Sequence, residues 1–172
     1  MNSKLAIKRA ILENIDPIMD IVNKCTQHMI SNGIYQWNDT YPSRETFLKD
    51  IEDENLYVLF KKDKIIGCVS FCNKMDEFYE KVEWLSDSKN NVYVHRLAIT
   101  PIEQGNGYSK ILMNYIEKEC KTKHVDSIRL DTFSVNEKNN KLYEGLGYKK
   151  LGQIYFRKQS DYPFNCYEKL LK

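Results

Sequence analysis

The stretch NVYVHRLAITPIEQGNGYSKILMNYIEKE, residues 91–119, contains the pattern that decides the fold. Residues 92–99 are β-forming and apolar except at His95 and Arg96, as expected of a central strand buried on both faces, and Pro101 ends this strand. Apolar residues of the next segment recur at helical spacing: Ile111, Leu112, Tyr115, Ile116 and Cys120. The stretch therefore predicts a strand, a glycine-containing loop and a helix that packs on the sheet.

The loop between this strand and helix, Gln104-Gly105-Asn106-Gly107-Tyr108-Ser109, has the composition of an anion site. The first amides of a helix lack intrahelical partners and carry partial positive charge, and glycines let a phosphate approach the backbone closely. Lys110 adds a full positive charge. The loop lacks both the Gly-x-Gly-x-x-Gly spacing and the Walker lysine, which argues against a dinucleotide or nucleoside triphosphate.

This segment resembles the acetyl-CoA loop of the GNAT acetyltransferase superfamily, in which Gln/Arg-x-x-Gly-x-Gly/Ala follows a strand that commonly ends Leu-Ala-Val. The chain has Leu97-Ala98-Ile99 and then Gln104, Gly107 and Ser109. Ser109 departs from the pattern, but it is only slightly larger than alanine and can donate a hydrogen bond to phosphate. The resemblance implies that residues 97–99 and 104–110 bind acetyl-CoA.

A second signature of the same family follows in the expected order. Residues 127–133 predict a strand, and NEKNNKLYEGLG, residues 136–147, predicts a helix closed by a glycine. With Tyr148 this segment resembles Asn-x-x-Ala-x-x-Leu-Tyr-x-x-x-Gly-Phe, with Asn139 in place of alanine. The resemblance implies that Asn136 and Asn139 contact the cofactor and that Tyr143 is the general acid for the CoA sulfur. Aromatic packing against neighbouring leucines is the alternative for Tyr143.

The remaining elements complete the order β-α-α-β-β-β-α-β-α-β-β. The other expected strands are residues 5–11, 56–61, 65–73, 150–157 and 165–171, and two further helices precede residue 52. Residues 75–89 form a connection or a short helix. The resemblance implies a single α/β domain over residues 1–172 with the GNAT fold. Its mixed sheet has a splayed parallel fourth and fifth strand, and about four helices flank it.

The acceptor amine must lose a proton before it attacks, and His95 is the first candidate base. Its unperturbed pKa lies near 6.5, and strand alternation predicts that it shares a face with Leu97 and Ile99. Its position also resembles that of a histidine in the arylalkylamine N-acetyltransferases that helps to remove the amine proton. Two alternatives stay open: a histidine hydrogen-bonded within the sheet, and a water relay to Glu77, Glu80 or Glu83.

Two aromatic residues, Trp37 and Tyr41, are candidates for the wall of the acceptor pocket, because the loop between the first two helices borders that pocket in the GNAT fold. A core position for one of them is the alternative. Arg96 is assigned no role beyond neutralising a neighbouring carboxylate.

Composition restricts the partners. The net charge of +2, from 26 basic and 24 acidic residues, gives no nucleic-acid signal. No apolar run reaches the roughly 20 residues of a membrane span, and the histidines lack metal-ligand spacing. Five cysteines without a Cys-x-x-Cys pair suit a reducing cytoplasm.

We therefore expect a cytoplasmic N-acetyltransferase that transfers acetyl directly from acetyl-CoA to a small-molecule primary amine, without a metal. A protein or peptide acceptor, a noncatalytic acyl-CoA-binding module and a structural α/β domain remain alternatives. Family analogy also allows a homodimer.

Overall fold

The β-forming segments join into one seven-stranded mixed sheet in the computed structural model, which describes residues 4–171. The strands lie in the order β1-β2-β3-β4-β5-β7-β6, and only the neighbours β4 and β5 run parallel. Their bounds are β1 Leu5–Arg9, β2 Leu56–Lys61, β3 Lys64–Cys72, β4 Asn91–Ile99, β5 Ser127–Phe133, β6 Lys149–Ile154 and β7 Phe164–Leu170. This mixed sheet with its parallel central pair confirms the predicted fold class.

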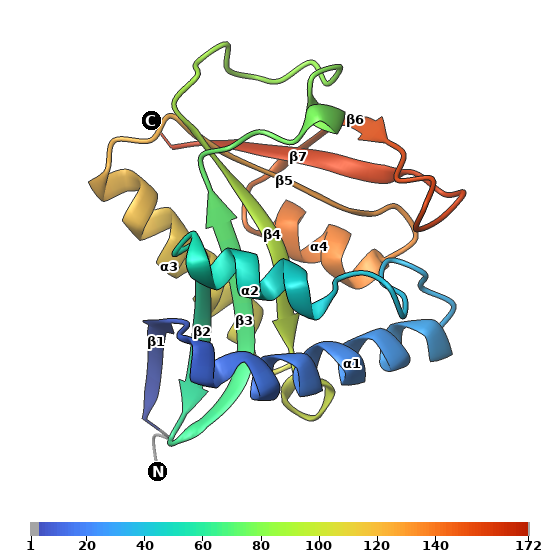
Figure 1. The fold of residues 1–172 in the computed structure, drawn as a ribbon. Coiled ribbons are helices and arrows are strands. Elements are labelled where there is room, and N and C mark those ends of the chain that lie inside the picture. The colour runs from blue at the N-terminus through green and yellow to red at the C-terminus, as the bar shows by residue number, and fades with distance from the viewer. Residues whose placement is uncertain (1–3, 172) are drawn as a thin grey trace.

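Four α-helices cover the two faces of the sheet (Figure 1). They are α1 Ile15–Ser31, α2 Arg44–Glu52, α3 Tyr108–Thr122 and α4 Glu137–Gly145, with 3-10 turns at Leu12–Asn14, Glu77–Tyr79 and Pro101–Glu103. The apolar stripe of α1 packs with α2 on one face of the sheet. Helix α3 packs on the other face, together with Leu142 and Tyr143 of α4. The sheet is therefore buried on both sides, as its apolar central strands require.

The predicted element order is confirmed, and the differences lie at strand ends. Strand β1 ends at Arg9 rather than Ile11, because the chain turns into the 3-10 segment Leu12–Asn14. Strand β6 ends at Ile154 rather than Arg157. The single domain over residues 1–172 stays a prediction, since residues 1–3 and 172 lie outside the described part of the chain.

The parallel strands β4 and β5 pair over only part of their length. Their register runs from Asn91 opposite Ser127 to Val94 opposite Leu130, and both strands continue beyond this last pair. Backbone groups past Val94 on β4 and past Leu130 on β5 therefore do not serve this ladder. The expected opening between the two strands is present.

A bulge in β4 lies at the start of this opening. Arg96 has a φ of 54°, and the β3–β4 register shifts between Cys68 and Ser70. The extra residue reverses the inward and outward alternation of the strand. Leu97 and Ile99 consequently pack on the α3 side, whereas His95 lies against Tyr79 on the other side. The prediction that His95 shares a face with Leu97 and Ile99 is wrong for this reason.

The connection over residues 75–89 contains the short 3-10 turn Glu77–Tyr79 and is otherwise irregular. A buried ion pair holds its second half: Arg129 Nε donates to Glu168 Oε1 at 2.9 Å, and both side chains are at most 5% exposed. The same two residues bind the backbone of the connection at Leu85 and Ser86. The connection is therefore fixed to β5 and β7 and forms one wall of the site.

Candidate active site

The loop before α3 carries a row of backbone amides that point to no protein acceptor. Gly105 and Gly107 have φ angles of 82° and 79°, in the left-handed region where glycine is favoured, and a Cβ at either position would meet nothing within 4 Å. Within the described residues, no hydrogen bond is donated by the backbone amides of residues 105–110. Free amides at the start of a 15-residue helix fit the pyrophosphate of CoA.

Gln104 fixes this loop to its surroundings. Its Nε2 donates to the carbonyl oxygen of Ile99 at 3.0 Å, and its Oε1 accepts from Lys138 Nζ at 2.9 Å. The side chain thus joins the end of β4, the anion loop and α4. Its predicted contact with acetyl-CoA stays a prediction.

The start of α4 borders the same opening. Asn136 caps the helix by accepting from the Asn139 amide at 3.2 Å, and its Nδ2 donates to Gln36 Oε1 at 3.0 Å. Asn136 is buried, so its side chain is used within the protein. Asn139 donates to Thr132 Oγ1 at 3.3 Å and lines the cavity described below. Cofactor contacts of both asparagines stay predictions.

Tyr143 combines the two roles considered from the sequence. Its ring packs near Tyr148 and Tyr167, with centroids 6.0 and 5.9 Å away. Its side chain is only 4% exposed, yet it lines the cavity, and none of the hydrogen bonds among the described residues involves its hydroxyl. Burial, with a smaller contribution from the negative charge of Asp131, raises the pKa of Tyr143 well above its ordinary value. The phenol therefore stays protonated at neutral pH and is available as a donor.

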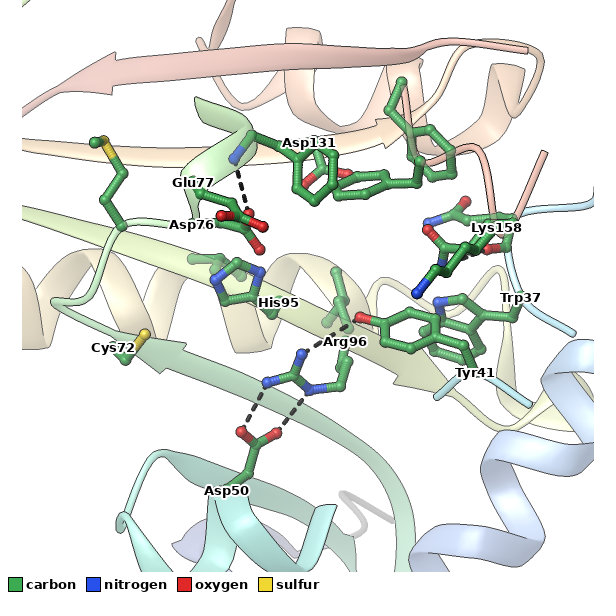
Figure 2. Close-up of a pocket in the computed structure, with 18 of the residues that line it drawn as sticks. Trp37, Tyr41, Asp50, Cys72, Asp76, Glu77, His95, Arg96, Asp131 and Lys158 are labelled. Atoms are coloured by element: carbon green, nitrogen blue, oxygen red, sulfur yellow. Dashed lines mark hydrogen bonds and ion pairs between the residues drawn. The ribbon is translucent and has the colours of Figure 1, made fainter. Parts of the chain in front are cut away.

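A cavity of about 880 Å³ leads from the surface to Tyr143. Its walls come from the loop of residues 36–41 between α1 and α2, residues 72–78, residues 155–159 before β7, and residues 94–97 of β4. Figure 2 shows Asp76, Glu77 and His95 at one end and Trp37, Tyr41 and Lys158 at the other. The size suits a small molecule.

Both predicted pocket aromatics line this cavity. Trp37 is 6% exposed and also belongs to the apolar core beneath α1 and α2, so it has the core position considered as an alternative. Tyr41 is half-buried, and its hydroxyl oxygen accepts from Arg96 Nη1 at 3.5 Å. The two residues form an aromatic wall at one end.

Arg96 has a more definite place than the sequence indicated. Its Nε and Nη2 each donate to one carboxylate oxygen of Asp50 at 2.7 Å, in a bidentate pair whose side chains are 13% and 10% exposed (Figure 2). Asp50 comes from α2, so this pair ties the helix to the bulge of β4. Sequence reasoning missed Asp50, because nothing in the helix pattern indicates its partner.

His95 lines the cavity, and its ring lies 6.5 Å from that of Tyr79. Burial, and to a lesser degree the charge of Arg96, lowers the pKa of His95 to about 3. The imidazole is therefore neutral at pH 7 but is a weak proton acceptor. Of the three glutamates considered for a water relay, Glu77 lines the cavity, whereas Glu80 and Glu83 do not.

Asp131 is a cavity residue that the sequence reasoning did not identify. It lies on β5, immediately after the last pair of the β4–β5 ladder, and accepts a hydrogen bond from the hydroxyl of the fully buried Tyr79. Burial raises the pKa of Asp131 to about 6, while the Tyr79 hydrogen bond opposes this shift. The available signal was a carboxylate within the strand segment IRLDTF, a position where a charged side chain needs a reason.

Comparison with known proteins identifies the class. The model of the acetyltransferase (GNAT) family matches residues 15–148. The uncharacterized N-acetyltransferase YesJ of Bacillus subtilis (strain 168) is 22% identical over 146 residues, which are 83% of this chain and 81% of YesJ. The chain therefore belongs to the GNAT acetyltransferase family. It is an acyltransferase whose cosubstrate is acetyl-CoA.

Solved structures agree with this fold. A GNAT-family acetyltransferase from Streptococcus agalactiae 2603 superposes with a TM-score of 0.81 at 22% identity, covering 96% of this chain and 95% of that one. YncA from Salmonella typhimurium, solved with its cofactor acetyl-CoA, superposes with a TM-score of 0.72 at 17% identity, covering 99% and 95%.

Residues 4–171 contain neither a candidate membrane-spanning helix nor a cluster of metal-ligating side chains. No helix there is long and apolar enough to cross a membrane. No group of three or more His, Cys, Asp or Glu side chains in this range is arranged to hold a metal ion.

Proposed function

We propose that this enzyme acetylates the primary amine of a small molecule by direct transfer from acetyl-CoA, with Tyr143 as the general acid. One observation carries the proposal: the cavity that Tyr143 lines is also lined by residues 94–97 of β4 and by Asp131 of β5, where the two strands stop pairing. The acceptor enters through the cavity, and the thioester reaches the same point along the opening. Positioning of two reactants in this way supplies much of the rate in a bimolecular transfer.

The chemistry requires only proton movements and one displacement. The unprotonated amine nitrogen forms a bond to the acetyl carbon, the C–S bond breaks with its electron pair on sulfur, and Tyr143 gives its proton to that sulfur. The phenolate regains a proton that leaves the nitrogen. Because the amine arrives as an ammonium ion, one further proton is released to solvent for each acetamide formed.

Removal of that first proton is the costly step before attack. An alkylamine with a pKa near that of lysine costs about 4 kcal/mol to deprotonate at pH 7. His95, the base expected from the sequence, is neutral and lines the cavity, but its lowered pKa of about 3 makes it a poor acceptor of this proton. In the proposal, His95 accepts a hydrogen bond from the amine.

The small-molecule acceptor is supported by the walls of the cavity. Aromatic residues from three segments face it, namely Trp37 and Tyr41, Phe78, and Tyr155 and Phe156. Such a cavity with aromatic walls fits an amine with an apolar body. A protein substrate would instead have to present its amine on an extended segment.

Coenzyme A release with an amine panel tests the proposal, with the free thiol detected by a chromogenic reagent. We expect release with at least one small primary amine and formation of its acetamide. Release only with peptides would indicate a protein acceptor. Thermal stabilisation by acetyl-CoA without release would indicate the noncatalytic binding module.

The cytoplasmic location and the homodimer are part of the same proposal. All five cysteines lie within the described residues and are free thiols, four of them buried, which suits a reducing compartment. Light scattering of the purified protein tests the dimer that family analogy allows.

A further inference from the structure

Among residues 4–171 the Asp131 carboxylate forms no ion pair, although the charge of Arg96 acts on it from a distance. It lies at the position on β5 that follows Leu130, as His95 follows Val94 on β4, so the two side chains stand at the same level where the strands part. None of the ion pairs among residues 4–171 includes Asp131. The neighbouring cation Arg96 is already bound by both oxygens of Asp50.

Tyr79 holds this carboxylate toward the cavity. The Tyr79 side chain is fully buried between Tyr93 and Trp84, and its hydroxyl donates to Asp131 Oδ1. Asp76, from the same connection, lines the cavity near Asp131 and adds negative charge. Burial destabilises the charged form of a carboxylate that has one hydrogen bond and no ion-pair partner. A positively charged ligand would stabilise that charged form.

The carboxylate also lies within electrostatic reach of the proposed acid. The charge of Asp131 contributes to the raised pKa of the Tyr143 phenol, and both side chains line the cavity. A cation bound at Asp131 would therefore lie in the cavity that Tyr143 lines, where the proposed function places the CoA sulfur.

We propose that Asp131 binds the acceptor as its ammonium ion and accepts the proton that leaves before attack, which makes alkylamines rather than weakly basic arylamines the acceptor class. This inference rests on the proposed function. In the step, one N–H bond of the ammonium ion breaks and an O–H bond forms on Asp131, which then releases the proton to solvent. Tyr79 is the positioning residue for the carboxylate.

The acid–base strengths agree with this assignment. The pKa of Asp131, raised to about 6, exceeds that of His95, lowered to about 3, so Asp131 is the stronger base of the two. A base with a pKa near the working pH is the more effective one. The titratable and charged groups facing Asp131 are Tyr79, Asp76, Arg96, His95, Tyr41, Tyr143 and Cys166.

An equilibrium experiment tests the site without turnover. Benzylamine and p-toluidine are isomers, and at pH 7.5 the first is a cation while the second is neutral. Calorimetric titration of the wild-type protein should show tighter binding of benzylamine, and Asp131→Asn should remove this preference. Equal binding of the two isomers by the wild-type protein, or an unchanged preference in the variant, would overturn the proposal.

A kinetic experiment tests the proton transfer. With benzylamine, Asp131→Asn should lower kcat/KM by about 10²-fold or more, the size of a general-base contribution, while Asp131→Glu should recover part of the loss. The acidic limb of the pH profile, expected near pH 6, should move upward in Tyr79→Phe, because the variant lacks the hydrogen bond that lowers the pKa of Asp131. Equal kcat/KM in the wild-type and Asp131→Asn enzymes would contradict the role.

The two experiments separate this inference from the proposed function. If benzylamine binds through Asp131 but no amine releases CoA, the ammonium site stands and the acetyl transfer to small amines fails. If CoA is released equally by wild-type and Asp131→Asn enzymes, the transfer stands and the ammonium site fails. Melting temperatures of each variant check that the fold is intact.

Discussion

The ion pair between Asp50 and Arg96 gives a prediction whose size follows from the structure. Asp50→Ala leaves a guanidinium that is 13% exposed without its bidentate partner. An unpaired buried charge costs about 3–5 kcal/mol of unfolding free energy. For a chain of this length each kcal/mol shifts the melting temperature by about 2–4 °C, so a fall of roughly 6–20 °C is expected.

The assay is calorimetric melting of the wild-type protein, Asp50→Ala and a matched control. Asp20→Ala is the control, because it breaks the Lys24–Asp20 pair on α1 whose side chains are 56% and 61% exposed. Exposed pairs contribute little, so the control should melt close to the wild-type protein.

A double variant tests the physical reason. Asp50→Ala/Arg96→Gly removes both charges, and glycine accepts the φ of 54° that Arg96 adopts. We expect the double variant to be more stable than Asp50→Ala, because no buried charge is left unpaired. A double variant that is destabilised by the sum of the single changes would refute the reasoning, as would a control that loses as much as Asp50→Ala.

Three further outcomes follow from the site. Tyr143→Phe should keep the wild-type melting temperature and lower kcat. Tyr148→Phe is the control, because it removes the hydroxyl of a buried neighbouring ring and should leave kcat unchanged. Equal kcat for Tyr143→Phe and wild type would remove the phenol from the mechanism. Gly107→Glu should abolish the rise in melting temperature caused by acetyl-CoA, whereas Gly33→Glu, at a glycine outside the loop with a similar φ of 72°, should retain it. Loss of the rise in both variants would show strain rather than repulsion of pyrophosphate. His95→Asn should reduce the loss of stability on acidification. The pKa of His95 is lowered from 6.5 to about 3 in the folded protein, so the unfolded chain binds more protons between these pH values. Melting temperatures measured from pH 6.5 to pH 3 check this, and an unchanged slope of melting temperature against pH would contradict it.

The parts of the site that the sequence revealed are those encoded by neighbouring residues. Gly105 and Gly107 mark a backbone that needs left-handed φ angles before a helix. Asn136 and Tyr143 belong to the same helix, so the short family signature that spans them was enough to single out Tyr143 as a candidate. The same holds for the element order, because each strand and helix shows its own periodicity.

The missed parts depend on contacts between distant segments. Asp50 and Arg96 are 46 residues apart, and Tyr79 and Asp131 are 52 apart, so no local pattern pairs them. The bulge at Arg96 had the further consequence of reversing the alternation of β4 after His95, which a strict two-residue period does not anticipate. Tertiary pairing, rather than propensity, decided these features.

A crystal structure of the protein with CoA tests the central claim most directly. The account predicts the pyrophosphate against the backbone amides of residues 105–110 and the sulfur within hydrogen-bonding distance of the Tyr143 hydroxyl, between β4 and β5. CoA bound away from this opening, or a sulfur remote from Tyr143 while the pyrophosphate occupies the loop, would contradict it.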